Sequence, residues 1–381
     1  MRCADIDLKL SGNTAGGYLV EVLSSPHGRT EPHPLVLPSD LVGKIELVRT
    51  RRGDRNTHTY LGVALFAALF PQPISRIWDL SRGSVGEAGV LRLRLDIRAE
   101  ELTHVPWEML RSDEGYLALS ARSQVVRYLG SAPPAPGRVR RENLNVMLVT
   151  ATPKNVSPLP GVRKELTLVS DTLKKLAAIV PVQIKVIENA TFDVLRTQLD
   201  GSFNVLHFMG HGAFEQNRGF LIFEDSEGNA SWQEAESVAD VLRDKNVELL
   251  VLNACDTAIP SQKESLIGVA QAAHAARVPA VVAMQQAILD RAAPAFAAAF
   301  YDALAKDHPL ETCLAAGRVA TKNQLGNDSA DWSIPVLFSN AEYRTPDLNT
   351  QPAGSISIGG NVTKGIVAIQ GSNSTIEQHN H

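Results

Sequence analysis

The chain has 381 residues, of which 44% are hydrophobic, and its 37 basic and 41 acidic residues give a formal charge of −4. This near balance gives no argument for nucleic acid or an anionic membrane as a partner. Three cysteines are too few for a disulfide framework and fit a reducing compartment. The N-terminus has no signal-peptide pattern, and the apolar runs reach about ten residues where a membrane span needs about 20. We therefore expect a soluble, cytoplasmic protein with neither nucleic acid nor membrane as partner.

Residues 1–129 combine strand patterns with one helix. Residues 17–23 and 91–98 alternate apolar and polar side chains, which is typical of half-solvated antiparallel strands. Between them, residues 58–70 have helical composition and end before Pro71. The histidines and the cysteine of this part have no metal-ligand spacing, so neither a metal nor another cofactor is expected. These features predict an N-terminal α+β region over 1–129.

A Pro- and Gly-rich stretch over 130–142 has linker composition and precedes a predicted catalytic domain over 143–346. In this domain strand and helix patterns alternate. The predicted strands are 144–150, 182–187, 203–209, 247–254, 279–284 and 334–338. The predicted helices are 162–178, 191–200, 236–245, 264–277, 290–306 and 310–323. This alternation predicts an α/β fold with a mostly parallel sheet of about six strands and helices on both faces, interrupted by one hairpin over 219–229.

Two of the apolar strands stop at a reactive side chain. The strand over 203–209 is followed by His211 between two glycines, and the strand over 247–254 is followed by Cys255. Functional groups of open α/β sheets lie at the carboxyl ends of the strands, so adjacent strands would bring the imidazole and the thiol together. A thiol becomes a strong nucleophile as a thiolate, and a nearby imidazole supplies that state. We predict a catalytic dyad of His211 and Cys255.

Further groups around this pair follow from the same reasoning. The glycines on either side of His211 allow a sharp turn and the close approach of a substrate carbonyl. The backbone N–H groups of Gly212 and Cys255 are the expected oxyanion-hole donors. For the group that orients the imidazole, Glu224, Asp225 and a backbone carbonyl all stay open.

Plainer interpretations of the same residues exist. A cysteine after an apolar strand is most often a small buried hydrophobic residue. His207 lies four residues before His211, and its functional interpretation is that it binds a metal together with Cys255. Inside a strand, such a pair is not expected to share a face as it does on a helix, so His207 is predicted to be a core or supporting histidine. Cys313 and Cys3 have no paired base and are predicted to be inert.

The motifs at the two strand ends resemble those of the CHAT family, bacterial relatives of caspases and separase among the clan CD cysteine proteases. They are His211-Gly212 and the run Asn253-Ala254-Cys255-Asp256-Thr257-Ala258. Residues 105–110, 116–120 and Asp331-Trp332 fit the same resemblance, which covers roughly 17–340. It implies a caspase–haemoglobinase-like fold (a three-layer αβα sandwich), an endopeptidase activity and His211 with Cys255 as the dyad. The caspase sequence after the nucleophile is absent, so a preference for aspartate in the substrate is not implied.

The resemblance also suggests substrate contacts and regulation. Asp256 either faces a basic P1 side chain or caps the next turn, and Asp331 and Trp332 are further candidates for substrate binding. The segments 256–264 and 212–219 have loop composition and are expected to order only in an activated state. We therefore expect a latent protease with protein or peptide substrates, activated by a sensor protein, in bacterial immunity or regulated cell death.

The tail over 347–381 is rich in Gly, Ser and Asn and is prone to β structure. Residues 355–361 are echoed eleven positions later by 366–372. These units resemble short amyloid signalling motifs, with low charge, β-branched residues and no proline after Pro352, as cross-β stacking requires. One interpretation is self-assembly by strand addition through residues 354–377. The other is a disordered tail or a lone hairpin.

Three functions compete for this sequence. A latent cysteine endopeptidase is the preferred one. The alternative is a caspase-like pseudoenzyme that works as a scaffold through its tail, which the intact pair of His211 and Cys255 argues against. A hydrolase of small amides or thioesters is disfavoured, because nothing in the sequence resembles a cofactor or acyl-carrier pocket.

Overall fold

The computed structural model describes residues 3–12, 16–86, 89–128, 144–216, 218–243, 245–255, 265–286, 288–289, 291–306, 308–339, 356–362 and 365–371. The predicted linker over 130–142 and the predicted loop over 256–264 lie outside these ranges.

Ten α-helices form in the described part of the chain, mostly where apolar residues recur with helical spacing. They are α1 (Leu41–Arg49), α2 (Arg55–Leu69), α3 (Ile74–Val85), α4 (Glu100–Thr103), α5 (Gly161–Leu176), α6 (Phe192–Gln198), α7 (Ala235–Arg243), α8 (Ser265–Ala275), α9 (Ala293–Ala305) and α10 (Leu310–Leu325). Three short 3-10 helices are η1 (Trp107–Met109), η2 (Leu117–Leu119) and η3 (Asp331–Ser333).

Fifteen strands form one sheet, and most neighbouring pairs are parallel. In spatial order its main path is β17 (Gly365–Gly371), β16 (Ile356–Val362), β9 (Val182–Ile187), β8 (Leu144–Thr150), β10 (Val205–Glu215), β13 (Leu249–Cys255), β14 (Ala280–Met284), β15 (Pro335–Ser339), β7 (Ser123–Tyr128), β4 (Val90–Ile97), β1 (Cys3–Gly12), β2 (Tyr18–Ser24) and β3 (His33–Leu35). Off this path, β11 (Arg218–Glu224) pairs with β10 and with β12 (Ala230–Glu234). A separate hairpin is formed by β5 (Arg111–Ser112) and β6 (Gly115–Tyr116). The mostly parallel sheet predicted from the sequence is confirmed, but it has fifteen strands instead of about six, because strands of the N-terminal region and of the tail extend it.

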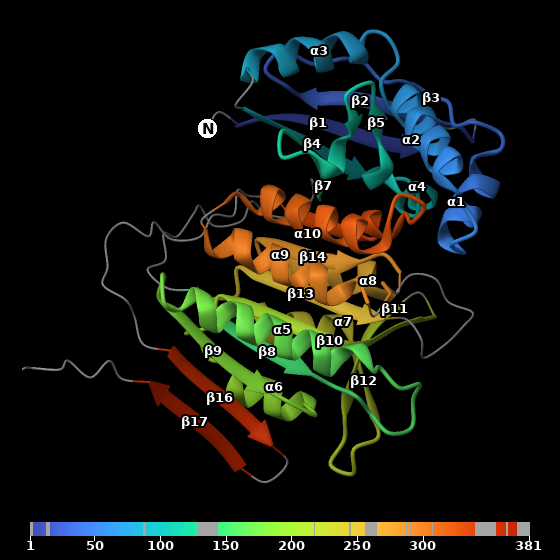
Figure 1. Cartoon of the computed structure of the whole chain (residues 1–381). Coiled ribbons are helices and arrows are strands. Elements are labelled where there is room, and N and C mark those ends of the chain that lie inside the picture. The colour runs from blue at the N-terminus through green and yellow to red at the C-terminus, as the bar shows by residue number, and fades with distance from the viewer. Residues whose placement is uncertain are drawn as a thin grey trace, which may run out of the picture.

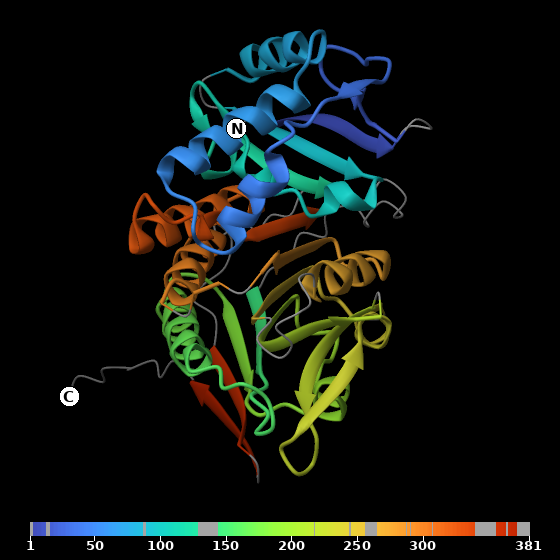
Figure 2. The same cartoon turned by 90° about the vertical axis from the view of Figure 1, so that its right-hand side faces the viewer.

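The six strands predicted for the catalytic domain lie together in the middle of this sheet. β9, β8, β10, β13 and β14 run parallel, and β15 runs antiparallel to β14. These strands are nearly continuous apolar runs, so both faces of the sheet need cover. Figures 1 and 2 show α5, α9 and α10 on one face and α8 on the other.

The sheet continues beyond β15 into the N-terminal region. Phe338 of β15 pairs with Arg127 of β7, and the ladder runs on through β4, β1, β2 and β3, at the top of Figure 1. Two hydrophobic cores lie along it. One is built mainly from residues up to Val125, and the other from residues between Val126 and Phe338. The N-terminal elements therefore extend the same sheet while keeping a core of their own.

The expectation of a half-solvated antiparallel strand over 91–98 is wrong. β4 is an interior strand, parallel to both β1 and β7. Two of its alternating polar residues are arginines that form ion pairs inside the sheet: Arg92 lies 2.6 Å from Asp5, and Arg94 lies 2.6 Å from Asp7, both on β1. A strand can thus alternate apolar with charged residues and still be covered, provided its charges have partners.

The glycines that flank His211 suggested a turn, but the backbone stays extended there. β10 runs on to Glu215 and pairs with β11, so the loop predicted over 212–219 is a β-hairpin instead. The reason for Gly210 is close packing: a Cβ there would lie 2.8 Å from the Phe208 ring and 3.0 Å from the Ala151 carbonyl oxygen. The hairpin predicted over 219–229 is confirmed as β11 and β12.

The echoed units of the tail are two strands of one hairpin. β16 and β17 pair antiparallel, with Val362 opposite Gly365. β16 also adds to the edge of the catalytic sheet, parallel to β9, with Ile358 opposite Ile184. This hairpin is the red element beside β9 in Figure 1.

Within the described residues, no single helix has the length and apolarity to cross a membrane. α2 and α3 pass that test only as a pair, and they are bent by 101° at the break between them.

Candidate active site

The two strands that carry His211 and Cys255 are neighbours in the sheet, as predicted. β10 and β13 pair in parallel from Val205 opposite Leu249 up to His211 opposite Cys255. Direct partners on adjacent strands stand at the same level and on the same face of a pleated sheet. The fold therefore brings these two positions together although 44 residues separate them (255 − 211).

The surroundings of His211 are closed. The histidine is 0% exposed, and Gly212 beside it is buried opposite Leu221 in the β10–β11 ladder. Asp256 and the rest of the segment that follows Cys255 lie outside the described residues. The dyad and the oxyanion-hole donors Gly212 and Cys255 thus stay a prediction. The pairing of His211 with Cys255 in the backbone register supports the dyad.

A buried carboxylate lies under the strand ends. Glu165 of α5 is 3% exposed, and its Oε1 accepts a 2.6 Å hydrogen bond from Nδ2 of Asn253, two residues before Cys255. The same oxygen lies 3.3 Å from Nε2 of His207, a distance typical of an ion pair but without the alignment of a hydrogen bond. α5 is thereby tied to both β10 and β13.

A second helix completes this polar cluster. Tyr301 of α9 is fully buried, and its hydroxyl lies 3.0 Å from Nδ1 of His207. The prediction of a core histidine at 207 is confirmed by its 1% exposure. The reasoning behind it was wrong, because positions i and i+4 of a strand do share a face. They are kept apart by the rise of the strand, about 13 Å over four residues.

Glu165 and Tyr301 were missed in the sequence. The signal for Glu165 was available: it stands on the buried stripe of α5, among Val162, Leu166 and Val169. A carboxylate on an apolar stripe needs a partner, and that partner is here Asn253 of the Asn-Ala-Cys motif. Tyr301 gave no comparable signal, since a buried tyrosine on an apolar helix is ordinary.

The two carboxylates considered as orienting groups for His211 have other partners. Glu224 Oε1 accepts the backbone N–H of Thr152 at 2.9 Å, and burial raises the pKa of its carboxyl. Asp225 accepts the backbone N–H groups of Glu227 and Asn229 in the β11–β12 turn, which lowers its pKa. These contacts give no support to an orienting role for either residue.

The substrate contacts expected of Asp331 and Trp332 are not supported by the geometry. Asp331 is 2% exposed and receives a two-pronged ion pair from Arg51, with Nη2 to Oδ2 at 2.9 Å and Nε to Oδ1 at 3.1 Å. Trp332 is 2% exposed, and its ring centroid lies 4.7 Å from that of Tyr116. Both side chains lie at the junction between the N-terminal elements and the catalytic half.

A buried ion pair reaches from that junction to the end of β14. Arg127 and Glu108 are 3% and 0% exposed at their side chains and lie 3.0 Å apart. Gln285, directly after β14, accepts from Arg127 at 2.9 Å and donates to Glu108 at 2.9 Å. The N-terminal elements therefore fix the chain at the carboxyl end of a strand that neighbours β13.

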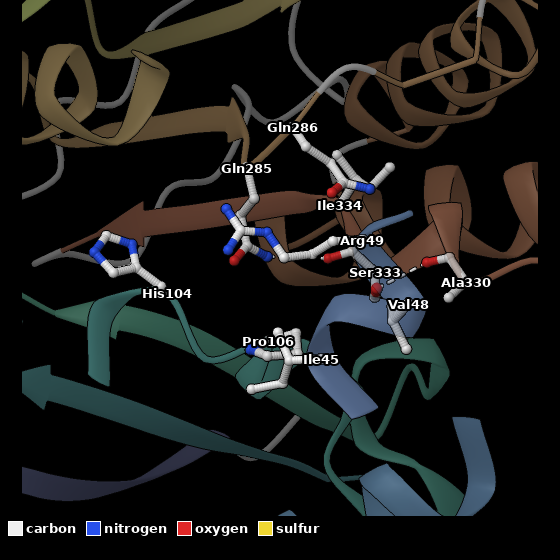
Figure 3. Close-up of a pocket in the computed structure, with 10 residues that line it drawn as sticks. All are labelled: Ile45, Val48, Arg49, His104, Pro106, Gln285, Gln286, Ala330, Ser333 and Ile334. Carbon is white, nitrogen blue, oxygen red and sulfur yellow. Dashed lines mark hydrogen bonds between the residues drawn. The ribbon is translucent and has the colours of Figure 1, made fainter. Parts of the chain in front are cut away.

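A pocket opens at this place (Figure 3). Its walls come from α1, from the segment between α4 and η1, from the two glutamines after β14 and from the residues around η3. Leu252 of β13 pairs with Ala283 of β14. Three residues further along each segment are Cys255 and Gln286, respectively. The pocket, which contains Gln286 and also Arg49, thus lies at the same edge of the sheet as the predicted dyad.

Comparisons with known proteins agree with this architecture. Two crystal structures of the Saccharomyces cerevisiae separase–securin complex have TM-scores of 0.52 and 0.50 with this protein, at 9% and 10% sequence identity. They cover 89% and 90% of this chain, which itself spans only 30% of each separase chain. The Arg-specific cysteine proteinase gingipain R has a TM-score of 0.42 at 9% identity, over 72% of this chain and 70% of its own. None of the curated proteins matches the chain.

The family is set by a match along most of the sequence. The model of the CHAT domain matches residues 60–340, which is more than half of the chain. The mixed α/β fold with its mostly parallel sheet is similar to that of separase. The chain belongs to the CHAT-domain family.

Proposed function

We propose that the chain is a cysteine endopeptidase with Cys255 as nucleophile and His211 as its base and acid. The observation that carries the proposal is the register of β10 and β13, in which these two positions are direct partners. Membership in the CHAT family adds support, because the motifs at His211 and Cys255 resemble those of its proteases.

The reaction follows from the chemistry of these two groups. The Cys255 thiolate attacks the scissile carbonyl carbon, and the resulting oxyanion accepts hydrogen bonds from the backbone N–H groups of Gly212 and Cys255. His211 donates its proton to the leaving amine, which departs with the C-terminal part of the substrate. A water molecule, deprotonated by His211, then attacks the thioester carbonyl and releases the acid, which restores the thiolate.

The pocket at the end of β14 is the proposed place for a substrate side chain. It opens at the carboxyl edge of the sheet, beside the strand that carries the nucleophile. Asp256 stays a prediction for contact with a basic P1 side chain, with capping of the next turn as the alternative.

Activity is proposed to be latent in the isolated cytoplasmic protein. A sensor partner, or self-assembly through residues 354–377, would activate it in bacterial immunity or regulated cell death. The separase structures were obtained with the protein securin, so a relative of this fold is known to take a protein partner. The alternative function, a scaffold without catalysis, is favoured by one observation: β16 adds to the edge strand β9, so the tail is able to extend the sheet.

A thiol-alkylating probe on the native protein separates these two functions. For an endopeptidase, Cys255 reacts fast, His211→Ala abolishes the fast reaction, and the matched variant His27→Ala, at an exposed histidine, leaves it unchanged. Cys313, which is 0% exposed, stays unlabelled in all of them. Equal labelling of Cys255 with and without His211 would contradict the dyad. Comparison of new protein N-termini in cells with active protein and with Cys255→Ala then identifies the substrates.

A further inference from the structure

A second, strongly polar cavity of about 340 Å³ lies between the N-terminal elements and α10. Its walls are the start of α2, the β5–β6 hairpin, the end of α10 and Trp332 of η3. None of its lining residues belongs to β10, β13 or the pocket beside Gln286. It is therefore a site separate from the predicted dyad.

Three cationic side chains from three different elements line this cavity: Arg55 of α2, Arg111 of β5 and Lys322 of α10. The lining contains one carboxylate, Glu114, which forms its ion pair with Arg82 at 3.2 Å. Within the described part of the chain, none of the three cations forms an ion pair with a carboxylate. Like charges that converge on one cavity repel one another, and an anionic ligand removes that repulsion.

The cations are arranged around an aromatic wall. The Arg111 guanidinium lies 5.1 Å and the Lys322 ammonium 5.9 Å from the centroid of the Tyr116 ring, and Trp332 packs on the same ring at 4.7 Å. Burial raises the pKa of the Tyr116 hydroxyl, while the nearby charges of Arg111 and Arg55 oppose that rise. The hydroxyl thus stays neutral, and the cations remain available to a ligand.

The hairpin wall is held firmly against α2. A Cβ on Gly62 would lie 2.4 Å from the Met109 carbonyl oxygen and 2.8 Å from Arg111 Cβ, so only glycine allows this approach. The backbone at Arg111 is thereby held close to α2, the helix that carries Arg55. Preformed placement of charged groups lowers the entropic cost of holding a ligand.

We propose that this cavity binds a small molecule that carries phosphate groups and a flat ring. The phosphates lie among Arg55, Arg111 and Lys322, since two or more cations are what a multiply charged oxyanion requires. The ring lies against Tyr116, which is half-buried and lines the cavity. Because α2 and the hairpin belong to the N-terminal core and α10 to the catalytic half, the ligand joins the two.

Thermal unfolding of the full-length chain at constant ionic strength tests this site without any need for protease activity. The probes are ATP and inorganic triphosphate without magnesium, with sodium chloride as the salt control. A ligand of the folded state raises the unfolding temperature with its concentration. We expect a saturable rise with both phosphates and a larger one with ATP. Arg111→Gln and Lys322→Gln each weaken binding by about tenfold, as the loss of one charge-assisted hydrogen bond does.

The matched control is Arg196→Gln, which removes an exposed cation of α6 that pairs with Asp193. It should bind both probes like the parent chain. No saturable shift at millimolar concentration, or an equal weakening in Arg196→Gln, would overturn the site. Equal affinity for ATP and triphosphate would overturn the place of the ring. Since Arg111 also packs on Tyr116, Lys322→Gln decides the result if Arg111→Gln is poorly folded.

Discussion

Replacement of Glu165 by alanine should loosen β13, the strand that carries the proposed nucleophile Cys255. The carboxylate accepts from Asn253 at 2.6 Å and lies 3.3 Å from His207 Nε2. Its removal leaves the buried Nδ2 of Asn253 without its hydrogen-bond acceptor, so the free energy of unfolding should fall by about 1–3 kcal/mol. The cavity left by the side chain adds to that loss.

Glu165→Gln is the matched variant. It keeps the size of the side chain and an oxygen that accepts from Asn253, but it removes the charge. A hydrogen bond to a charged group is worth about 1 kcal/mol more than a neutral one, so the loss of stability should be near that value. Urea unfolding of both variants measures these differences.

A second readout connects the cluster with the site. Asn253 stands two residues before Cys255 on β13, so freeing its side chain should slow the alkylation of Cys255 by the thiol probe in Glu165→Ala, while Glu165→Gln restores most of the rate. Unchanged urea midpoints together with an unchanged labelling rate in Glu165→Ala would refute the view that this carboxylate holds the strand. Lower stability with an unchanged labelling rate would limit its role to the core.

Three further predictions concern the junction, pH and the tail. Arg127→Met should cost about 3–5 kcal/mol in urea unfolding, because it leaves the fully buried Glu108 without its cation. Arg196→Met breaks the exposed pair with Asp193 and should cost less than about 1 kcal/mol; equal losses would contradict this. Folding raises the pKa of Glu224, so this carboxyl stabilises the fold fully below its unfolded pKa and loses that contribution as the pH rises through its folded pKa. Glu224→Gln and the parent chain should therefore be equally stable at low pH, and the variant should become the more stable of the two above about pH 4.5. A difference in unfolding temperature that is constant with pH would contradict this. Deletion after residue 350 should leave the catalytic fold intact and abolish concentration-dependent self-assembly. It should also speed amide hydrogen exchange in β9, because β9 then becomes an edge strand; unchanged exchange would contradict the pairing of β16 with β9.

The sequence alone determined the local elements of the catalytic half. β8 and β9 occur at the residues predicted for them, because a short, mostly apolar run such as 144–150 is typical of a buried strand. The same holds for α10, whose start at Leu310 follows a proline and whose end precedes Gly326. The positions of His211 and Cys255 at corresponding places on two adjacent strands agree with the sequence pattern, and their catalytic roles stay a prediction.

Local patterns could not fix what depends on distant partners. β4 has the alternation of a solvated strand, and only its place beside the aspartates of β1 makes it an interior one. The glycines around His211 suggested a turn, yet β11 provides a partner that keeps β10 extended to Glu215. Glu165 shows the same dependence, because its role follows from Asn253, 88 residues away.

Sequence patterns therefore decided which segments form helices and strands, because periodicity and burial are properties of neighbouring residues. The tertiary structure decided which strands are adjacent, which buried charges are paired and which cations share a cavity. Those are contacts between residues far apart in the chain, and no local pattern encodes their partners.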